Sequence, residues 1–177
     1  MSEHDHGDGD DHDEEGEDDH EHDGLIEAEF VQRDTVFYGG ELWLDYELFE
    51  WAGLHFGVDA QFDAVRGRLD RGNVPRQPPF RYGAGLHFHV ERVHGRVGFL
   101  RHARQKRTGA LETPTDAYTM LDASIALRLI SRGERALELH LNGWNLLDKR
   151  ARNHLNFRKD LFLLPGRSVR ISLHGRF

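Results

Sequence analysis

The chain of 177 residues contains no cysteine, which excludes a disulfide scaffold and a thiolate metal site. No apolar run approaches the roughly 18 residues that a transmembrane helix needs. A charged n-region followed by an apolar h-region, the mark of a secretory signal peptide, is also missing. There is no nucleophile–base pair or carboxylate pair on a recognisable catalytic scaffold, so the sequence predicts no enzyme.

Residues 1–23 lack Lys and Arg, and they also lack aromatic and branched apolar side chains. They contain thirteen of the 31 acidic residues, so the formal net charge of −8 averages an acidic head and a weakly basic remainder. Such a segment cannot bury a core, and we expect it to be disordered. The change in composition is sharp at Gly24 and separates a head of residues 1–23 from a domain of residues 24–177.

The head is also rich in histidine. Imidazole and carboxylate together are ligands for Zn²⁺ and, less specifically, for Ni²⁺, Cu²⁺ or Mn²⁺. We therefore predict that the head captures a divalent metal as a transported ligand, with no tightly bound cofactor. The alternative is a solvated acidic tail without a metal role. The predicted ligands are His4, His6, His12, His20 and His22.

From Gly24 onward, apolar and polar residues alternate, which predicts β-strands with two different faces. The pattern places Leu44, Phe56, Leu86, Leu127 and Leu173 on an apolar face. It places Asp45, His87, Arg128 and His174 on a polar face. Seven antiparallel strands are expected, at residues 25–48 (bent or interrupted near Asp34), 52–67, 79–92, 95–107, 117–130, 134–148 and 167–177.

The connections alternate between short turns and long loops, an arrangement typical of outer-membrane β-barrels with periplasmic turns and extracellular loops. A soluble β-sandwich or lipocalin-like barrel also alternates. Charged residues at strand centres, strand lengths of ten or more residues and aromatics near strand ends favour the membrane barrel. The expected aromatic girdle consists of Phe37, Tyr38, Phe49, Trp51, Phe80 and Tyr82.

Four segments resemble the TonB-dependent outer-membrane receptors of bacteria. They are the strand at Gln32–Leu42, the NLLDK-containing segment Asn142–Ala151, the PGR segment Leu164–Val169 and the terminal aromatic Phe177. The resemblance implies a 22-stranded barrel filled by an N-terminal plug that carries a TonB box. This chain matches only the last seven strands and lacks an export signal, so we expect it to be a C-terminal fragment.

Within that family, Glu112–Tyr118 and Ala151–Asp160 are most similar to late loops of the zinc-uptake receptors. Those receptors carry His- and Asp-rich extracellular loops, and the head resembles the remnant of one. The implied function is uptake of zinc, another metal ion or a metal chelate, although siderophore and cobalamin receptors share the same C-terminal motifs. His154 and Asp160, in the last long loop, are further candidate metal ligands. The competing hypothesis is a soluble or periplasmic metal-binding β-protein.

The expected partners follow from the same resemblance. They are outer-membrane lipid and lipopolysaccharide, the barrel assembly machinery that recognises a terminal aromatic, and the TonB system acting through the missing plug. A basic loop contains Arg66, Arg68, Arg71 and Arg76 without interleaved aromatics, so we expect no nucleic-acid binding. His55, His87 and His89 fall on the polar face, where ordinary lining of a barrel lumen is favoured over a metal relay.

Overall fold

A computed structural model describes residues 32–176, so the predicted head, residues 25–31 of the first expected strand and Phe177 lie outside the described part. The described residues include no helix that is long and apolar enough to cross a membrane. Their regular structure is entirely β. The strands are β1 (Thr35–Trp51), β2 (Leu54–Leu69), β3 (Arg81–Val90), β4 (Val93–His102), β5 (Tyr118–Arg132), β6 (Arg135–Trp144) and β7 (Ser168–Arg176).

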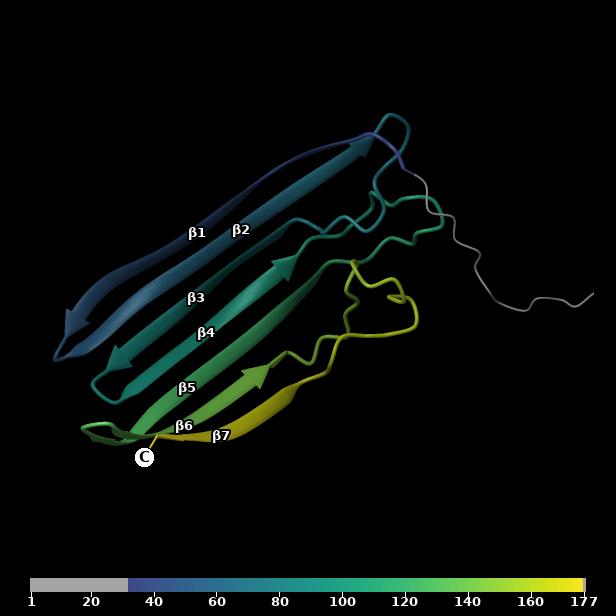
Figure 1. The fold of residues 1–177 in the computed structure, drawn as a ribbon. Coiled ribbons are helices and arrows are strands. Elements are labelled where there is room, and N and C mark those ends of the chain that lie inside the picture. The colour runs from purple at the N-terminus through teal and green to yellow at the C-terminus, as the bar shows by residue number, and fades with distance from the viewer. Residues whose placement is uncertain (1–31, 177) are drawn as a thin grey trace, which may run out of the picture. The chain divides into compact units, whose positions relative to one another are not determined.

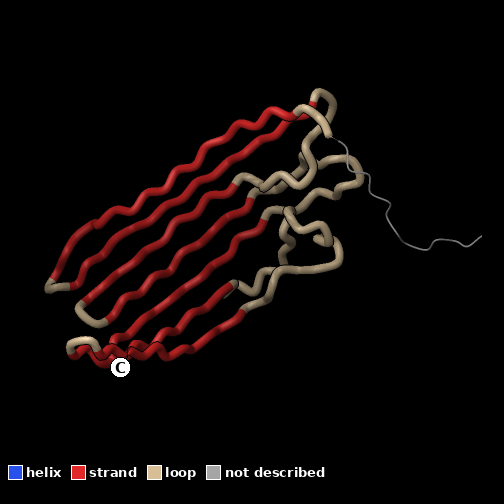
Figure 2. Tube along the Cα trace, viewed as in Figure 1, coloured by secondary structure: helices blue, strands red, loops and turns tan. Residues whose placement is uncertain are grey.

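All seven strands form one antiparallel sheet in which each strand pairs with its neighbour in sequence (Figure 1). The prediction of seven antiparallel strands is therefore confirmed. Two-residue turns follow β1, β3 and β5, and long loops follow β2, β4 and β6. The turns lie at one end of the sheet and the long loops at the other (Figure 2). The first turn is a tight hairpin, because Ala52 and Gly53 both have positive φ, at 51° and 76°.

Every strand differs from its predicted bounds by at least one residue, and three of these boundaries have a clear cause in the strand pairing or the backbone. β1 begins at Thr35, because its partner β2 offers no residue beyond Leu69. β4 stops at His102, beyond which only an isolated bridge joins this segment to the chain before β5. β6 stops at Trp144, because Asn145 turns the backbone to a φ of 48°.

The register confirms the predicted division into two faces. Residues directly opposite each other in paired strands share a face. One row across the sheet joins Leu44, Ala60, Ala84, Phe99 and Leu121, and the next row joins Asp45, Asp59, Gly85, Gly98 and Asp122. We call the side of the first row the apolar face and the side of the second row the polar face.

The apolar face has no protein cover within the described residues. Leu44 is 51% exposed, Leu86 is 59% exposed and Ile171 is 71% exposed. A soluble β-sandwich would cover such a face with a second sheet. The single layer is instead the arrangement expected of a barrel wall, which supports the membrane-barrel prediction over the sandwich.

Most of the predicted aromatic girdle lies on the apolar face. Phe49 packs against Phe56 with ring centroids 5.1 Å apart, and Phe80 lies 4.9 Å from Phe62. Phe37 is the exception, because its register partner is Gly67 on the polar face. The ring covers that glycine, where a Cβ would lie 2.5 Å from Phe37 Cε1. Phe37 therefore lies on the polar face and does not belong to a girdle on the apolar face.

A β-bulge interrupts β1, because its register shifts between Glu47 and Phe49 while β2 continues without a gap. Leu48 is the extra residue. Beyond the bulge, Glu50 returns to the polar face and pairs with His55. The bulge therefore places two carboxylates, those of Glu47 and Glu50, near the same histidine.

Candidate metal sites

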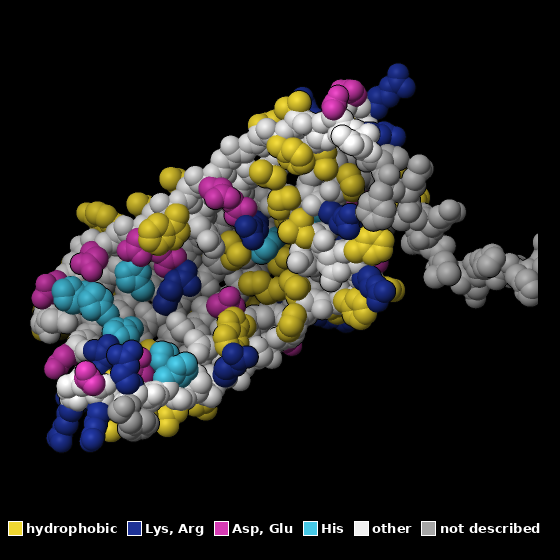
Figure 3. All heavy atoms as spheres, viewed as in Figure 1, with side chains coloured by type: hydrophobic (Ala, Val, Ile, Leu, Met, Phe, Trp, Pro, Cys, Tyr) yellow, Lys and Arg dark blue, Asp and Glu magenta, His cyan; other side chains and the backbone are white. Residues whose placement is uncertain are grey.

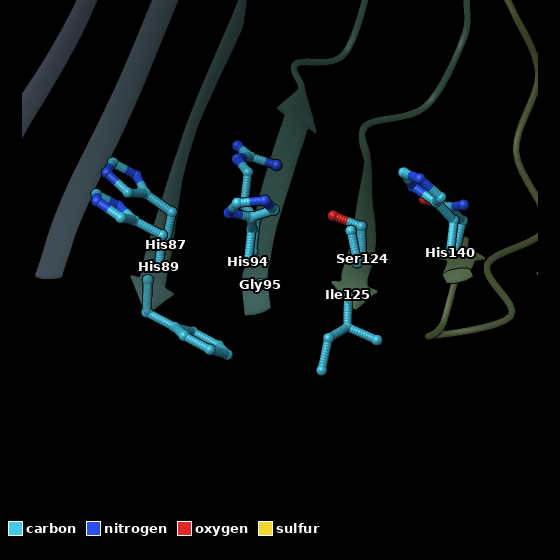
Figure 4. Close-up of a pocket in the computed structure, with 11 residues that line it drawn as sticks. His87, His89, His94, Gly95, Ser124, Ile125 and His140 are labelled. Carbon is cyan, nitrogen blue, oxygen red and sulfur yellow. The ribbon is translucent and has the colours of Figure 1, made fainter. Parts of the chain in front are cut away.

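Histidines gather on the polar face near the two-residue turns (Figure 3). His55, His89 and His94 are directly opposite one another on β2, β3 and β4. His140 belongs to the same row on β6, separated from His94 by Ala126 of β5. We call these four residues the histidine row. Figure 4 shows His89, His94 and His140 on separate strands, with Ile125 directed away from them.

The row borders a shallow depression of about 530 Å³ on the polar face. Its lining includes His87, His89, His94, Arg96 and His140. These side chains come from three strands, so the site depends on correct register and not on a single sequence motif. The depression offers ring nitrogens to a bound ion and space for water.

One end of the row also contains carboxylates. The His55 and His89 rings stack with centroids 4.3 Å apart and planes 4° from parallel. His55 Nδ1 lies 3.9 Å from Glu47 Oε2 and 4.0 Å from Glu50 Oε2. One ligand atom from each of Glu47, His55 and His89 lies within 4.8 Å of the other two. Two imidazoles and one carboxylate are a donor set suited to Zn²⁺ and related divalent ions.

His87 lies one row further from the turns, between two carboxylates. Its Nε2 is 3.8 Å from Asp45 Oδ1, and its Nδ1 is 3.8 Å from Asp59 Oδ2. Asp59 is already engaged, because it accepts a hydrogen bond of 2.8 Å from Arg96 Nε. The ring fits because Gly57, its partner on β2, has no side chain, and a Cβ there would collide with the imidazole.

At the far end of the sheet, His140 and His174 lie with ring centroids 4.7 Å apart. His140 Nε2 is 3.4 Å from Glu138 Oε2. The Glu138 carboxylate also accepts a hydrogen bond of 3.0 Å from Arg128 Nε. The guanidinium neutralises this carboxylate, so the far pair is less favourable for a cation than the site around Glu47.

The long loops hold a second cluster, which contains both of the predicted loop ligands. His154 is 2% exposed, and its Nδ1 shares a hydrogen bond with Thr115 Oγ1. Its Nε2 lies 3.1 Å from Glu112 Oε1, although this atom has no partner of hydrogen-bond geometry among the described residues. The Glu112 carboxylate itself accepts hydrogen bonds from the backbone N–H groups of Arg76 at 3.0 Å and Gly109 at 2.8 Å.

Asp160 approaches the same loop from another side. Its carboxylate accepts a 2.8 Å hydrogen bond from Thr113 Oγ1, and the buried Lys159 donates through Nζ to that hydroxyl at 2.7 Å. His154 and Asp160 therefore both attach the loop after β6 to the loop after β4. Their role as metal ligands stays a prediction, and the contacts shown here describe a clamp between two loops.

Burial lowers the pKa of the His154 imidazole below its usual value, and the nearby Lys159 ammonium acts in the same direction. The Glu112 carboxylate opposes this shift. The hydrogen bond from Thr113 lowers the pKa of the Asp160 carboxyl. The clamp thus favours a neutral His154 and an ionised Asp160.

Asn145 follows the end of β6, and its side chain satisfies backbone groups of the loop that follows. It is 4% exposed. Its Nδ2 donates to the carbonyl oxygens of Lys149 and Pro165, both at 3.0 Å, and its Oδ1 accepts from Lys149 N at 2.8 Å. The NLLDK and PGR segments are therefore joined by one side chain.

The predicted head ligands His4, His6, His12, His20 and His22 lie outside the described residues. The sequence pattern placed His55, His87 and His89 on the polar face. It did not predict that His55 and His89 form a row with His94 and His140. The two-residue turn between β3 and β4 was the available signal, because it sets His89 opposite His94. No sequence signal predicted that Glu50 approaches His55, because this contact depends on the bulge.

Comparisons with known proteins agree with this architecture. No family model matches the chain, and no curated protein matches it. Among solved structures, the chain is similar to one named "Copper transporter OprC", with a TM-score of 0.69 and 20% sequence identity. The similarity covers 81% of this chain and 24% of that one, so the chain spans about a quarter of the neighbour's length. The chain accordingly shares the β-sheet fold of that transporter.

Proposed function

We propose that the chain forms part of the wall of a bacterial outer-membrane receptor of the TonB-dependent type, which imports a metal ion. The observation that carries this proposal is the two-faced sheet. Its apolar face is uncovered, whereas its polar face carries histidines and carboxylates at strand centres. A wall between lipid and an aqueous lumen requires this division. The solved neighbour, a copper transporter, has the same fold, which adds support.

In this proposal, the two-residue turns face the periplasm and the long loops face the cell exterior. The loop clamp of His154, Glu112 and Thr115 then lies on the outer side, and the histidine row lies near the inner side. The chain acts in binding and transport rather than in catalysis. Its partners are lipid and lipopolysaccharide, the barrel assembly machinery, and the TonB system through a plug domain.

Zinc is the proposed ion. The chain has no cysteine and only two methionines, so it lacks the soft ligands that select Cu⁺. Its available donors are imidazole and carboxylate, which suit Zn²⁺ and divalent copper. The sequence of the late loops resembles that of zinc-uptake receptors, which favours Zn²⁺ over Cu²⁺.

Detergent dependence tests the membrane assignment. The full chain should aggregate in plain buffer and should give a β-sheet circular-dichroism spectrum in detergent micelles, with a sedimentation profile of a single species. A monomeric, folded chain in plain buffer would instead establish the competing hypothesis of a soluble metal-binding β-protein. That hypothesis would leave the exposure of the apolar face without an explanation.

Ion preference is tested on the same detergent sample. Competition with a chromophoric chelator should show binding of Zn²⁺ that survives physiological salt. Each ion is compared with the chelator and not with the other ion, because Cu²⁺ binds nitrogen and oxygen sites more tightly than Zn²⁺ in general. Replacing the five head histidines with alanine should lower the number of ions bound per chain. An unchanged stoichiometry would remove metal capture by the head from the proposal.

A further inference from the structure

We propose that Glu47, His55 and His89 form a divalent transition-metal site on the polar face, distinct from the histidines of the head and from the loop clamp. Metal binding there rests on the geometry of these three side chains. Its role as a transit site near the periplasmic end rests on the proposed function. The class of ligand is a borderline divalent ion such as Zn²⁺ or Cu²⁺.

The donor atoms are already close together. One ligand atom from each residue lies within 4.8 Å of the others, and the two rings are in contact at 4.3 Å. A shared ion would have to lie near the plane of each imidazole, so at least one of the parallel rings must turn about its Cβ–Cγ bond. That torsion is broad for histidine. The His55 side chain is 31% exposed, so part of its ring borders open space into which it can turn.

The fold brings these three residues together by two independent devices. Pairing of β2 with β3 sets His55 opposite His89. The bulge at Leu48 then gives β1 an extra residue, so that Glu47 and Glu50 both approach His55. A bulge beside a cluster of ionisable groups commonly redirects a side chain for function.

The charge balance distinguishes this site from the other histidines on the polar face. Glu47 and Glu50 form no ion pair with Arg or Lys among the described residues. By contrast, Glu138 beside His140 is bound by Arg128, and Asp59 beside His87 is bound by Arg96. Asp45 beside His87 also lacks an Arg or Lys partner among the described residues, but it adjoins a single imidazole. Within the described part of this face, the site around Glu47 is therefore the place where two contacting imidazoles adjoin carboxylates that no guanidinium neutralises.

Three protein ligands leave a coordination position open to water or to another donor, as in zinc sites that exchange a ligand. His94, directly opposite His89 on the next strand, is the nearest such donor in the histidine row. An ion held in this way can be passed along the row instead of being trapped. The open geometry suits a transported ion better than a structural one.

The test uses the full chain in detergent micelles with the five head histidines replaced by alanine, titrated with ZnCl₂ by calorimetry. This parent should bind one Zn²⁺. The double variant His55→Gln/His89→Gln should lose at least ~10-fold in affinity, because even the loss of an outer-shell partner weakens metal sites by that factor. The control is His174→Gln, which replaces an exposed histidine outside the histidine row and should stay within about twofold of the parent.

Equal weakening in His55→Gln/His89→Gln and in His174→Gln, or no zinc binding by the parent, would overturn the site. If His55→Gln/His89→Gln fails to give the β-sheet spectrum of the parent, Glu47→Gln decides, since this side chain is 64% exposed and its replacement spares the fold. The Zn²⁺ affinity of Glu47→Gln must be lower than that of the parent, and an unchanged affinity would overturn the site. With Cu²⁺ as a probe, electron paramagnetic resonance should show coupling to two nitrogens that is absent from the double variant.

The outcome is separable from that of the proposed function. A head that binds no zinc in the natural chain, together with a functional Glu47–His55–His89 site, would remove metal capture by the head and leave this inference intact. If the head binds zinc but the test variants keep the affinity of the parent, the Glu47–His55–His89 site is overturned and metal capture by the head stands.

Discussion

The side-chain amide of Asn145 donates a 3.0 Å hydrogen bond to the carbonyl oxygen of Pro165, across 20 residues of sequence. The same Nδ2 donates to Lys149 O, also at 3.0 Å. Asn145 holds a φ of 48°, a left-handed conformation that asparagine tolerates better than most residues. One residue therefore ends β6 and fixes both ends of the loop that leads to β7.

Replacing Asn145 with Asp should destabilise the folded chain by about 1–3 kcal/mol, because two part-buried hydrogen bonds to carbonyl oxygens lose their donor while the tolerance for positive φ is retained. Denaturant unfolding in micelles measures the change. Asn153→Asp, at an exposed position in the same loop, is the matched control and should have little effect. Equal stability of the two variants would contradict the bridging role of Asn145.

Two adjacent glycines of β1 should respond differently to alanine. A Cβ at Gly39 would collide with the carbonyl oxygen of Ala64 and lie 3.0 Å from Val65 Cα, so the backbone would have to move. A Cβ at Gly40 meets nothing within 4 Å. Gly39→Ala should therefore cost about 1–3 kcal/mol by overpacking. Gly40→Ala should be neutral or slightly stabilising, and a similar loss in both variants would refute this packing.

The apolar face should be sensitive to charge. Leu44→Arg should cost about 2–4 kcal/mol if this position lies near the middle of the bilayer. Asp45→Arg, one residue away on the polar face, should cost much less. Folding into lipid vesicles, followed by the shift in gel mobility on heating, measures both. Equal tolerance of the two substitutions would contradict the orientation proposed for the sheet.

The loop clamp should loosen in acid. Because the folded protein lowers the pKa of His154, the folded state binds fewer protons than the unfolded loop. The contribution of this residue to stability is therefore present at neutral pH and is lost as the pH falls through the ordinary histidine value of about 6.5 toward the lower folded value.

Spin labels at Lys106 and at Leu161, which is 77% exposed, would report on the clamp by pulsed distance measurement. The distance distribution should broaden between pH 7.5 and pH 5 in the natural chain. His154→Gln should remove this change, whereas His94→Gln on the sheet should retain it, with a chelator present throughout. A pH response that persists in His154→Gln would assign the effect to another group.

Local sequence predicted most of the sheet. Alternation at Leu44 and Asp45, and again at Leu86 and His87, assigned these side chains to the faces that the structure shows. The bulge at Leu48 escaped prediction, because one extra residue in a strand leaves the hydrophobic pattern almost unchanged. With the bulge hidden, the approach of Glu50 to His55 was hidden too.

The loop cluster escaped prediction for a different reason. Thr115 and His154 are 39 residues apart and belong to no repeating pattern, so their contact depends on how two irregular segments meet. That His154 and Asp160 are metal ligands stays a prediction, while the structure shows that both side chains contact the same neighbouring loop. The contacts of His154 with Thr115 and Glu112 accompany its burial, which a sequence does not reveal.

Tyr118 and Ala151 are the two buried apolar residues of the described part of the chain. In the proposed membrane setting, a sheet with so small an interior obtains most of its hydrophobic free energy from the surrounding lipid, not from contacts among its own side chains. The apolar side chains that stabilise such a sheet lie on its outer surface. Under that proposal, substitutions at Leu44, Leu86 or Ile171, which would be silent on the surface of a water-soluble protein, act as core mutations, and the composition of the bilayer becomes a variable of the fold.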